Sequence, residues 1–173
     1  FNDSTRNRDI STEIFYPAEV AGQDVVITGG PYPVLIFGHG FVMTFESYDN
    51  FWNELVPQGY IMVFPGTEEG FTPDHGAFGL DLLFLEEAIS HENTNNSSIL
   101  FGAVENKSAV LGHSMGGGSS FLAAENNSNI TTMINFAAAE TTPSCISAAT
   151  NVTIPALVFA GSEDCVASPI DNL

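Results

Sequence analysis

The chain has 173 residues, of which 44% are hydrophobic, a size and composition typical of a single globular domain with a substantial core. It contains 3 lysines and arginines in total and 21 aspartates and glutamates, which gives a formal net charge of −18. Such a charge repels nucleic acid and anionic lipid, and no apolar run reaches the roughly 18 residues of a membrane span. We therefore expect one domain over 1–173, a substrate that is not strongly anionic, and neither nucleic acid nor a membrane as partner.

Strands alternate with helices along the chain. The first strand shows alternating polar and apolar residues, as at the edge of a sheet, whereas later strands are continuously apolar, which is typical of parallel strands covered on both faces. Strands are expected at 11–17, 25–27, 34–37, 60–65, 108–111, 132–137 and 155–161, and helices at 47–55, 77–91 and 119–125. The stretch 141–151 is expected to be a loop. This order predicts an α/β fold with a mostly parallel twisted sheet flanked by helices.

The segment 109–118 reads as a buried strand, a G-x-S-x-G turn and the start of a helix. This combination is typical of the nucleophile elbow of an α/β-hydrolase, in which a strained turn lifts the serine Oγ above the sheet. Ser114 is therefore the expected nucleophile. The Met115 N–H, at the helix N-terminus, is expected to stabilise an oxyanion.

Two further loops at carboxyl ends of strands carry suitable residues. The loop after 34–37 places Phe41 where its N–H serves as the second oxyanion donor and its ring as a wall of the acyl site. The loop after 155–161 carries Asp164, the expected acid of a catalytic triad, because it follows the serine in chain order. Glu140, at the end of the preceding strand, is the alternative acid.

The histidine of this triad should come last in the chain, but the 4 histidines all precede Asp164. We interpret His39 as structural and His113 as packed or lining the cleft, and His75 is the one histidine that could reach the cleft as a base. The simpler interpretation is that the C-terminal part of the domain is missing and that the catalytic histidine lies beyond Leu173.

The chain contains 2 cysteines, Cys145 and Cys165, on loops that should lie at neighbouring strand ends. An even number in a chain rich in Asn, Ser and Thr suggests export and a disulfide. We expect a Cys145–Cys165 disulfide that holds the loop of Asp164. The alternative is that Cys165 pairs with a cysteine in a missing segment.

Several of these segments together resemble secreted α/β-hydrolases of the cutinase and polyester-hydrolase type, with their dienelactone-hydrolase-like and chlorophyllase-like relatives. The matching segments are 7–8, 16–18, 33–41, 112–118 and 155–164. The resemblance implies the α/β-hydrolase fold, with Ser114 and Asp164 as catalytic residues and Phe41 and Met115 as oxyanion donors that also line the acyl subsite. Polyester hydrolases usually carry a tryptophan just after the strand that ends near Ala139, and 139–142 has none.

We therefore expect a secreted serine carboxylester hydrolase that acts through an acyl-enzyme on short- to medium-chain acyl esters or polyesters. Phe41, His113, Met115 and Glu140 are the expected substrate-binding residues. No metal-ligand spacing or phosphate-binding loop is present, so we expect no metal or cofactor. We also expect the protein to be a monomer. The alternatives are an esterase or lipase of narrower specificity in the same superfamily, or a non-catalytic relative that lacks the base.

Overall fold

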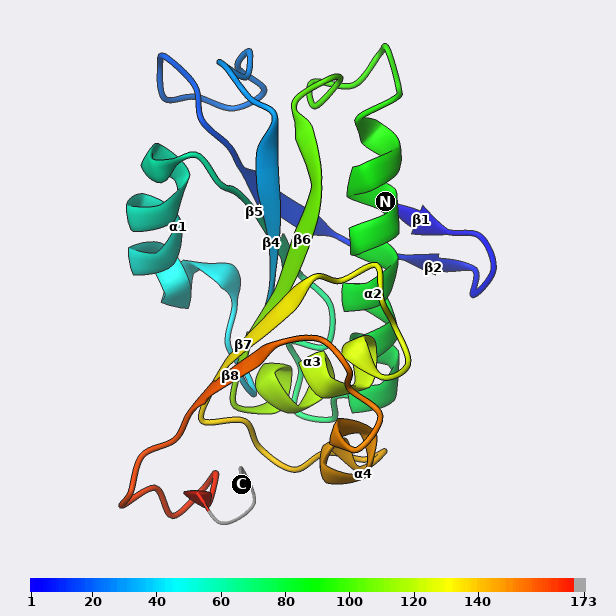
Figure 1. Cartoon of the computed structure of the whole chain (residues 1–173), viewed down its shortest axis with the longest axis vertical. Coiled ribbons are helices and arrows are strands. Elements are labelled where there is room, and N and C mark those ends of the chain that lie inside the picture. Colours follow the sequence, from blue (N-terminus) through cyan, green and yellow to red (C-terminus); the bar gives the residue numbers. More distant parts are fainter. Residues whose placement is uncertain (170–173) are drawn as a thin grey trace.

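The computed structural model describes residues 1–169, which form a six-stranded sheet with helices on both faces and a small hairpin at one side (Figure 1). The sheet order is β3-β5-β4-β6-β7-β8, and only β3 runs antiparallel to its neighbour. Its strands are β3 (Thr12–Phe15), β4 (Tyr32–Gly38), β5 (Ile61–Pro65), β6 (Val104–His113), β7 (Thr132–Phe136) and β8 (Ala156–Phe159). The α/β-hydrolase fold predicted from the sequence is confirmed.

The helices form two layers. They are α1 (Asp49–Leu55), α2 (His75–Glu92), α3 (Met115–Ala124) and α4 (Cys145–Ala149), with short 3₁₀ turns at Phe45–Tyr48 and Val56–Gln58. Helix α1 covers one face of the sheet, and α2 and α3 cover the other (Figure 1). Within residues 1–169, no helix has both the length and the apolar character needed to cross a membrane.

Each central strand is buried on both faces, which explains its continuous apolar run. In β4, Val34 and Ile36 pack with Leu82 and Leu85 on the α2 face, whereas Phe37 packs with the aromatic cluster of the α1 face. Side chains alternate between the two faces of a strand, so a strand with helices on both sides favours apolar residues at successive positions.

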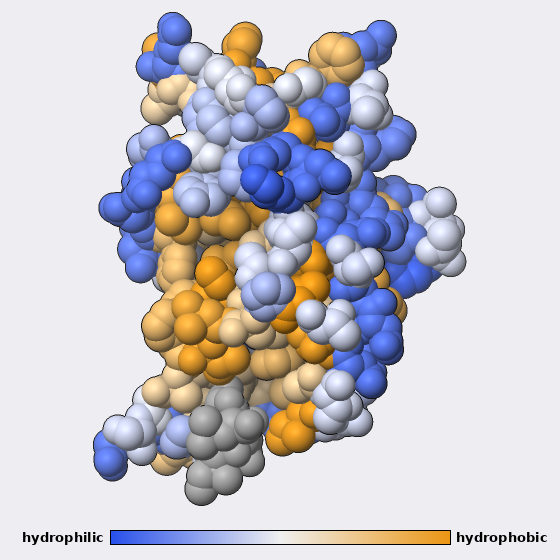
Figure 2. Space-filling view, in the orientation of Figure 1, coloured by the Kyte–Doolittle hydropathy of each residue, from blue (hydrophilic) through white to orange (hydrophobic). Residues whose placement is uncertain are grey.

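The edge strand β8 is less covered. Leu157 and Phe159 are 51% and 50% exposed, and apolar side chains gather on the face of the molecule that β7 and β8 form (Figure 2). The rings of Phe159 and Phe136 stack with their centroids 5.2 Å apart. This stacking links the ends of β7 and β8.

Two local predictions were wrong, and one element was not predicted. Residues 25–27 make only an isolated bridge between Ile27 and Ala18, because Val26 is 80% exposed and glycines follow at 29 and 30. The stretch 141–151 contains α4, which is capped by the Ser144 hydroxyl accepting the Ser147 N–H at 3.1 Å. The first residues form a hairpin of β1 (Asn2–Asp3) and β2 (Arg8–Asp9), which the sequence analysis did not predict.

Candidate active site

The order of strands brings two loops together at one edge of the sheet. After β4 the chain forms β5 on one side of it and then crosses to form β6 on the other side. In parallel α/β sheets, ligands bind beyond the carboxyl ends of the strands at such a reversal. The loop after β4 carries His39 to Phe41, and the turn after β6 carries Ser114.

Ser114 occupies a strained position between β6 and α3. Its φ of 54° and ψ of −121° lie in a region that side chains rarely adopt. The backbone is held there because the Ser114 N–H donates to the Phe136 carbonyl at 3.0 Å and its carbonyl accepts the Ala139 N–H at 2.9 Å. The surrounding strands therefore enforce the turn that presents the serine hydroxyl.

The two glycines of the G-x-S-x-G turn are required by close backbone packing. A β-carbon on Gly112 would lie 2.3 Å from the Gly116 carbonyl oxygen, and one on Gly116 would lie 2.1 Å from the Gly38 carbonyl oxygen. The first turn of α3 thus packs directly on the backbone of the loop after β4. This contact brings the serine turn and that loop together without intervening side chains.

Two backbone N–H groups beside this contact are free to bind an oxygen. Among residues 1–169, the Phe41 N–H makes no hydrogen bond, and the Met115 N–H belongs to the first turn of α3, where helix geometry supplies no acceptor. The preceding Gly40 N–H is already satisfied, because it donates to the Tyr48 hydroxyl at 2.7 Å. Tyr48 therefore helps to fix the loop from which the Phe41 N–H projects.

Buried His39 joins this loop to the loop after β5. Its Nε2 lies 2.8 Å from the Thr67 carbonyl oxygen, and its Nδ1 lies 2.9 Å from the Gly40 carbonyl oxygen. The ring also packs against Phe78 of α2, with centroids 4.7 Å apart. With both nitrogens held by backbone carbonyls, His39 connects two loops of the site.

A cluster of charged side chains around a buried carboxylate holds the loop after β5 in place. The carboxylate of Asp81, which is fully buried on α2, accepts the Thr67 hydroxyl at 2.7 Å and the Arg8 guanidinium at 2.7 and 2.9 Å. Arg6 contacts the same carboxylate at 2.8 Å. The bond to Asp81 raises the pKa of Arg8 above its usual value. Two of the chain's 3 basic residues are thus used to hold the N-terminal hairpin against α2 and Thr67.

His113 lines a small apolar cavity of about 340 Å³ on the α1 side of the serine turn. Its Nδ1 lies 3.0 Å from the Tyr48 hydroxyl oxygen. Burial lowers the pKa of His113, although the charge of Asp164 opposes this effect. Burial also shifts the pKa of Tyr48, in this case upward. The hydrogen bond from the Gly40 N–H lowers this pKa and offsets part of the rise. The other residues of the cavity wall are Phe37, Met43, Ser47, Asn50, Phe51 and Phe136.

Asp164 lies in the turn that follows β8. Its Oδ1 accepts the N–H groups of Val166 and Ala167 at 2.8 and 2.9 Å, and these bonds lower the pKa of Asp164. The charge of His113 lowers it further. Its second oxygen, Oδ2, accepts no hydrogen bond within residues 1–169.

Glu140 has a different environment. Its Oε2 accepts the Ile146 N–H at 3.2 Å and the Cys145 thiol at 3.0 Å, at the start of α4. Partial burial would raise the pKa of Glu140, but these bonds together with the Ser144 hydroxyl hold it below its usual value. The carboxylate is thus bound to α4, and no bond joins it to Ser114 in the part of the chain that is described.

The expected Cys145–Cys165 disulfide is wrong, since both cysteines are free thiols. Cys145 is buried with its Sγ against Glu140 and the Ala139 carbonyl, whereas Cys165 is exposed in the turn after Asp164. Burial and the neighbouring Glu140 carboxylate raise the pKa of Cys145 to about 12. The turn of Asp164 is instead held by its own backbone hydrogen bonds.

No histidine of the chain is bonded to Ser114 or Asp164 within the described residues. His75 begins α2, and its Nδ1 accepts the Thr142 N–H at 3.2 Å. No group of three or more His, Cys, Asp or Glu side chains in 1–169 is arranged to hold a metal ion.

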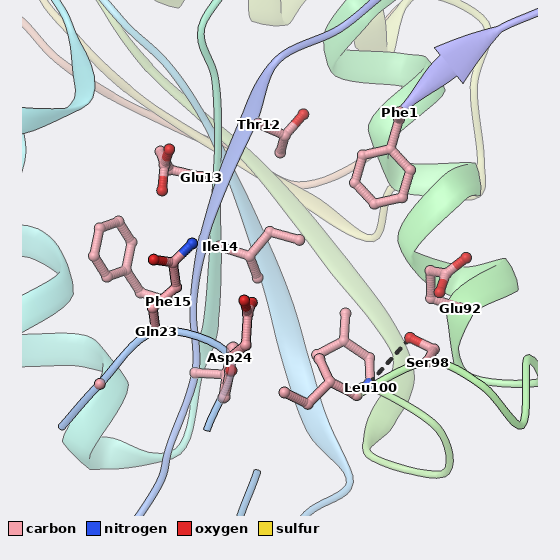
Figure 3. A pocket seen from close by; sticks show the side chains of 13 residues that line it. Phe1, Thr12, Glu13, Ile14, Phe15, Gln23, Asp24, Glu92, Ser98 and Leu100 are labelled. Atoms are coloured by element: carbon pink, nitrogen blue, oxygen red, sulfur yellow. Dashed lines mark hydrogen bonds between the residues drawn. The ribbon is translucent and has the colours of Figure 1, made fainter. Parts of the chain in front are cut away.

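A larger cavity, of about 690 Å³, lies elsewhere, over the edge strand β3 (Figure 3). Its wall includes Phe1, Ile14, Asp24, Glu92 and Leu100, and none of the loops described above contributes to it.

The sequence analysis did not identify Tyr48, Thr67 or Asp81 as part of the site. Tyr48 precedes an amphipathic helix, where a tyrosine looks like an ordinary core residue. A carboxylate within the apolar face of α2 was a usable signal for Asp81, because a buried charge needs partners.

The comparison with protein families agrees with this geometry. The PETase family, described as PET hydrolase-like, matches residues 10–172. The chain belongs to the PET hydrolase-like family. A second similarity within the α/β-hydrolases is to chlorophyllase type 0 of Chenopodium album, which is 33% identical over 120 residues. This alignment covers 63% of the chain and 33% of the chlorophyllase, so the chain spans about a third of that relative.

Proposed function

We propose that this member of the PET hydrolase-like family is a serine carboxylester hydrolase in which Ser114 is the nucleophile. The observation that carries the proposal is the Ser114 backbone at φ 54° and ψ −121°, between a buried strand and a helix, with the Gly38–Gly40 loop packed on the turn. This arrangement presents a hydroxyl beside two backbone N–H groups, which is what acyl transfer requires.

In the proposed reaction, the Ser114 oxygen attacks the ester carbonyl carbon while a general base takes the hydroxyl proton. The N–H groups of Phe41 and Met115 bind the negative oxygen of the tetrahedral intermediate. The C–O bond to the alcohol then breaks, the base returns the proton to the leaving alcohol, and an acyl-Ser114 ester remains. Water, deprotonated by the same base, hydrolyses this ester and frees Ser114.

Asp164 is the proposed acid that orients the base. Its lowered pKa keeps it ionised at neutral pH, and an ionised carboxylate can accept an imidazole N–H. The proposed base is a histidine. His39 and His75 are bound to backbone groups, His113 adjoins the nucleophile and His91 lies at the end of α2, so we assign the role of the base to none of these.

The proposed substrates are neutral esters with short- to medium-chain acyl groups, including polyesters. The net charge of −18 disfavours anionic substrates, and membership of the PET hydrolase-like family supports polyesters. The same family relationship supports secretion as a further part of the proposal. Phe41, Met115 and His113 are the proposed wall of the acyl site.

The test is to measure hydrolysis of ethyl butyrate by the intact protein and by its S114A variant. We expect S114A to lower kcat/KM by about 10⁴-fold or more, since the nucleophile is lost. S162A, a serine in the turn after β8, is the matched control and should keep the rate of the parent protein. Equal turnover by S114A and the parent protein would contradict the assignment, and an absence of turnover in the parent would favour a non-catalytic relative.

A further inference from the structure

The outer edge of β3 carries backbone groups that no other strand within residues 1–169 covers. Beside this edge, the Phe1 nitrogen donates to the Ile10 carbonyl at 3.0 Å, and the Ile10 N–H donates to the Phe1 carbonyl at 2.8 Å. The Ser11 carbonyl faces the other way and accepts a backbone N–H from the loop after β5 at 2.8 Å. Successive residues of an antiparallel strand direct their backbone groups to alternate edges. Those of Thr12 and Ile14 therefore face outward, on the side of Phe1.

A cavity of about 690 Å³ lies along the same edge. Figure 3 shows the side chains of Thr12, Ile14 and Leu100 directed toward one space. Leu100 is 2% exposed, and Ile14 packs against the hydrophobic core to which Leu100 belongs. The cavity thus offers an apolar surface beside the free backbone groups, where the side chains of an added strand would lie.

The wall of this cavity is acidic. It contains the carboxylates of Asp24 and Glu92, and none of the residues that form it is a lysine, arginine or histidine. Neither carboxylate forms an ion pair in the described part of the chain. The loop of Asp24 is held against β3, because the Tyr16 hydroxyl donates to the Val25 carbonyl at 2.9 Å. The charge of the wall therefore favours a positively charged ligand.

We propose that this edge of β3 binds an extended segment of another protein, with lysines at alternate positions, as an added antiparallel strand. The N–H and C=O groups of the segment pair with those of Thr12 and Ile14. Side chains of paired residues lie on the same face of a sheet, so a lysine opposite Thr12 or Ile14 points into the cavity. There its apolar stem covers Ile14 and Leu100. Its ammonium group reaches toward Asp24 or Glu92.

The charge of the chain argues against a second copy as the partner. Of its 3 basic residues, Arg6 and Arg8 bind Asp81, and Lys107 pairs with Glu105 at 2.8 Å. The net charge of −18 also makes two copies repel each other. The partner is therefore a different polypeptide. This surface lies outside the loops of the proposed active site, so the proposal does not depend on catalysis.

The first test is an NMR titration of the intact protein with the peptide acetyl-TKVKVKT-amide. We expect saturable shifts of the backbone amides of 12–16, 22–24 and 98–100, because these segments line the cavity. D24N/E92Q should weaken binding about ten-fold, the size of two exposed ion pairs. E54Q/E163Q is the control, since it removes two exposed carboxylates outside the cavity and changes the net charge equally, and it should keep the parent affinity.

The second test distinguishes strand addition from simple attraction between charges. Because the lysines pair with Thr12 and Ile14, their backbone N–H groups donate to β3, whereas those of the valines face away. Methylation of the lysine backbone nitrogens should abolish binding, and methylation of the valine backbone nitrogens should leave the affinity unchanged.

Three results would overturn the proposal. They are an absence of saturable binding by the unmodified peptide, equal affinities of the two methylated peptides, and equal affinities of D24N/E92Q and E54Q/E163Q. Amide shifts of 12–16 that arise when the protein alone is concentrated would place a second copy at this edge and would also contradict it.

Discussion

Gly116 packs backbone to backbone against Gly38, so the first turn of α3 and the loop after β4 touch without any side chain between them. A β-carbon on Gly116 would approach the carbonyl oxygens of Gly38 and His39 to 2.1 and 2.5 Å. The nucleophile turn and the proposed oxyanion loop therefore have one fixed separation. The requirement for glycine at this position comes from this approach.

We predict that G116A lowers the free energy of unfolding by about 3 kcal/mol or more, because a rigid backbone clash cannot be relieved by a side-chain rotation. Urea unfolding followed by circular dichroism measures this loss. G70A is the control, since a β-carbon there meets nothing within 4 Å, and it should change stability by less than about 0.5 kcal/mol. Similar free energies of unfolding for G116A and G70A would show that the backbone contact between Gly116 and Gly38 is not rigid.

Replacing Asp81 should be more costly than replacing a surface carboxylate. D81N leaves the Arg6 and Arg8 guanidiniums without their common anion. We expect the free energy of unfolding to fall by about 3 kcal/mol. This value is at the lower end of the range for buried ion pairs because both arginines are partly exposed. In contrast, E105Q removes the exposed pair with Lys107 and should cost less than about 1 kcal/mol. If D81N matched E105Q in chemical unfolding, the cluster would not hold the hairpin.

Tyr48 should affect catalysis through the position of the Phe41 N–H. Y48F removes the acceptor of the Gly40 N–H and the contact with His113, so we expect kcat for ethyl butyrate to fall about ten-fold while KM changes little. Stability should fall by about 1 to 2 kcal/mol. Y60F, whose hydroxyl makes no hydrogen bond within residues 1–169, is the matched control. A rise in KM with kcat unchanged would argue against a positioning role.

The N-terminal hairpin should make stability depend on acid pH. Hydrogen bonds from the Thr5 hydroxyl and the Arg6 guanidinium lower the pKa of Asp3 from 3.8 to about 2. A carboxylate with a lowered pKa in the folded state contributes stability above its unfolded value, and this contribution is lost as pH falls through the folded value. D3N should therefore be less stable than the parent at pH 7, and the difference should shrink between pH 4 and pH 2. A difference that stays constant over that range would contradict this assignment.

The sequence could predict those parts of the fold in which a local pattern of residues is compatible with a single local structure. The apolar run 34–37 predicted β4 because only a strand covered on both faces tolerates it, and G-x-S-x-G with its flanking strand and helix predicted the turn at Ser114. In contrast, α4 depends on capping by Ser144 and Glu140, and it occupies a stretch that the sequence analysis assigned to a loop.

The supporting parts of the site depend on contacts between distant segments. Asp81 meets Arg8 across 73 residues, and Tyr48 meets His113 across 65, and no local pattern encodes such pairings. The disulfide was wrong for the same reason. Neighbouring strand ends suggested that Cys145 and Cys165 would meet, but the capping of α4 directs the Cys145 thiol toward Glu140.

The central claim, that Ser114 is an activated nucleophile, is tested most directly by fluorophosphonate labelling of the intact protein followed by peptide mass mapping. We predict a single adduct on the peptide that contains Ser114, formed within minutes and abolished by unfolding the protein before treatment. Labelling requires both an activated serine and a working oxyanion site. An unlabelled Ser114, or an adduct on another serine, would contradict the account.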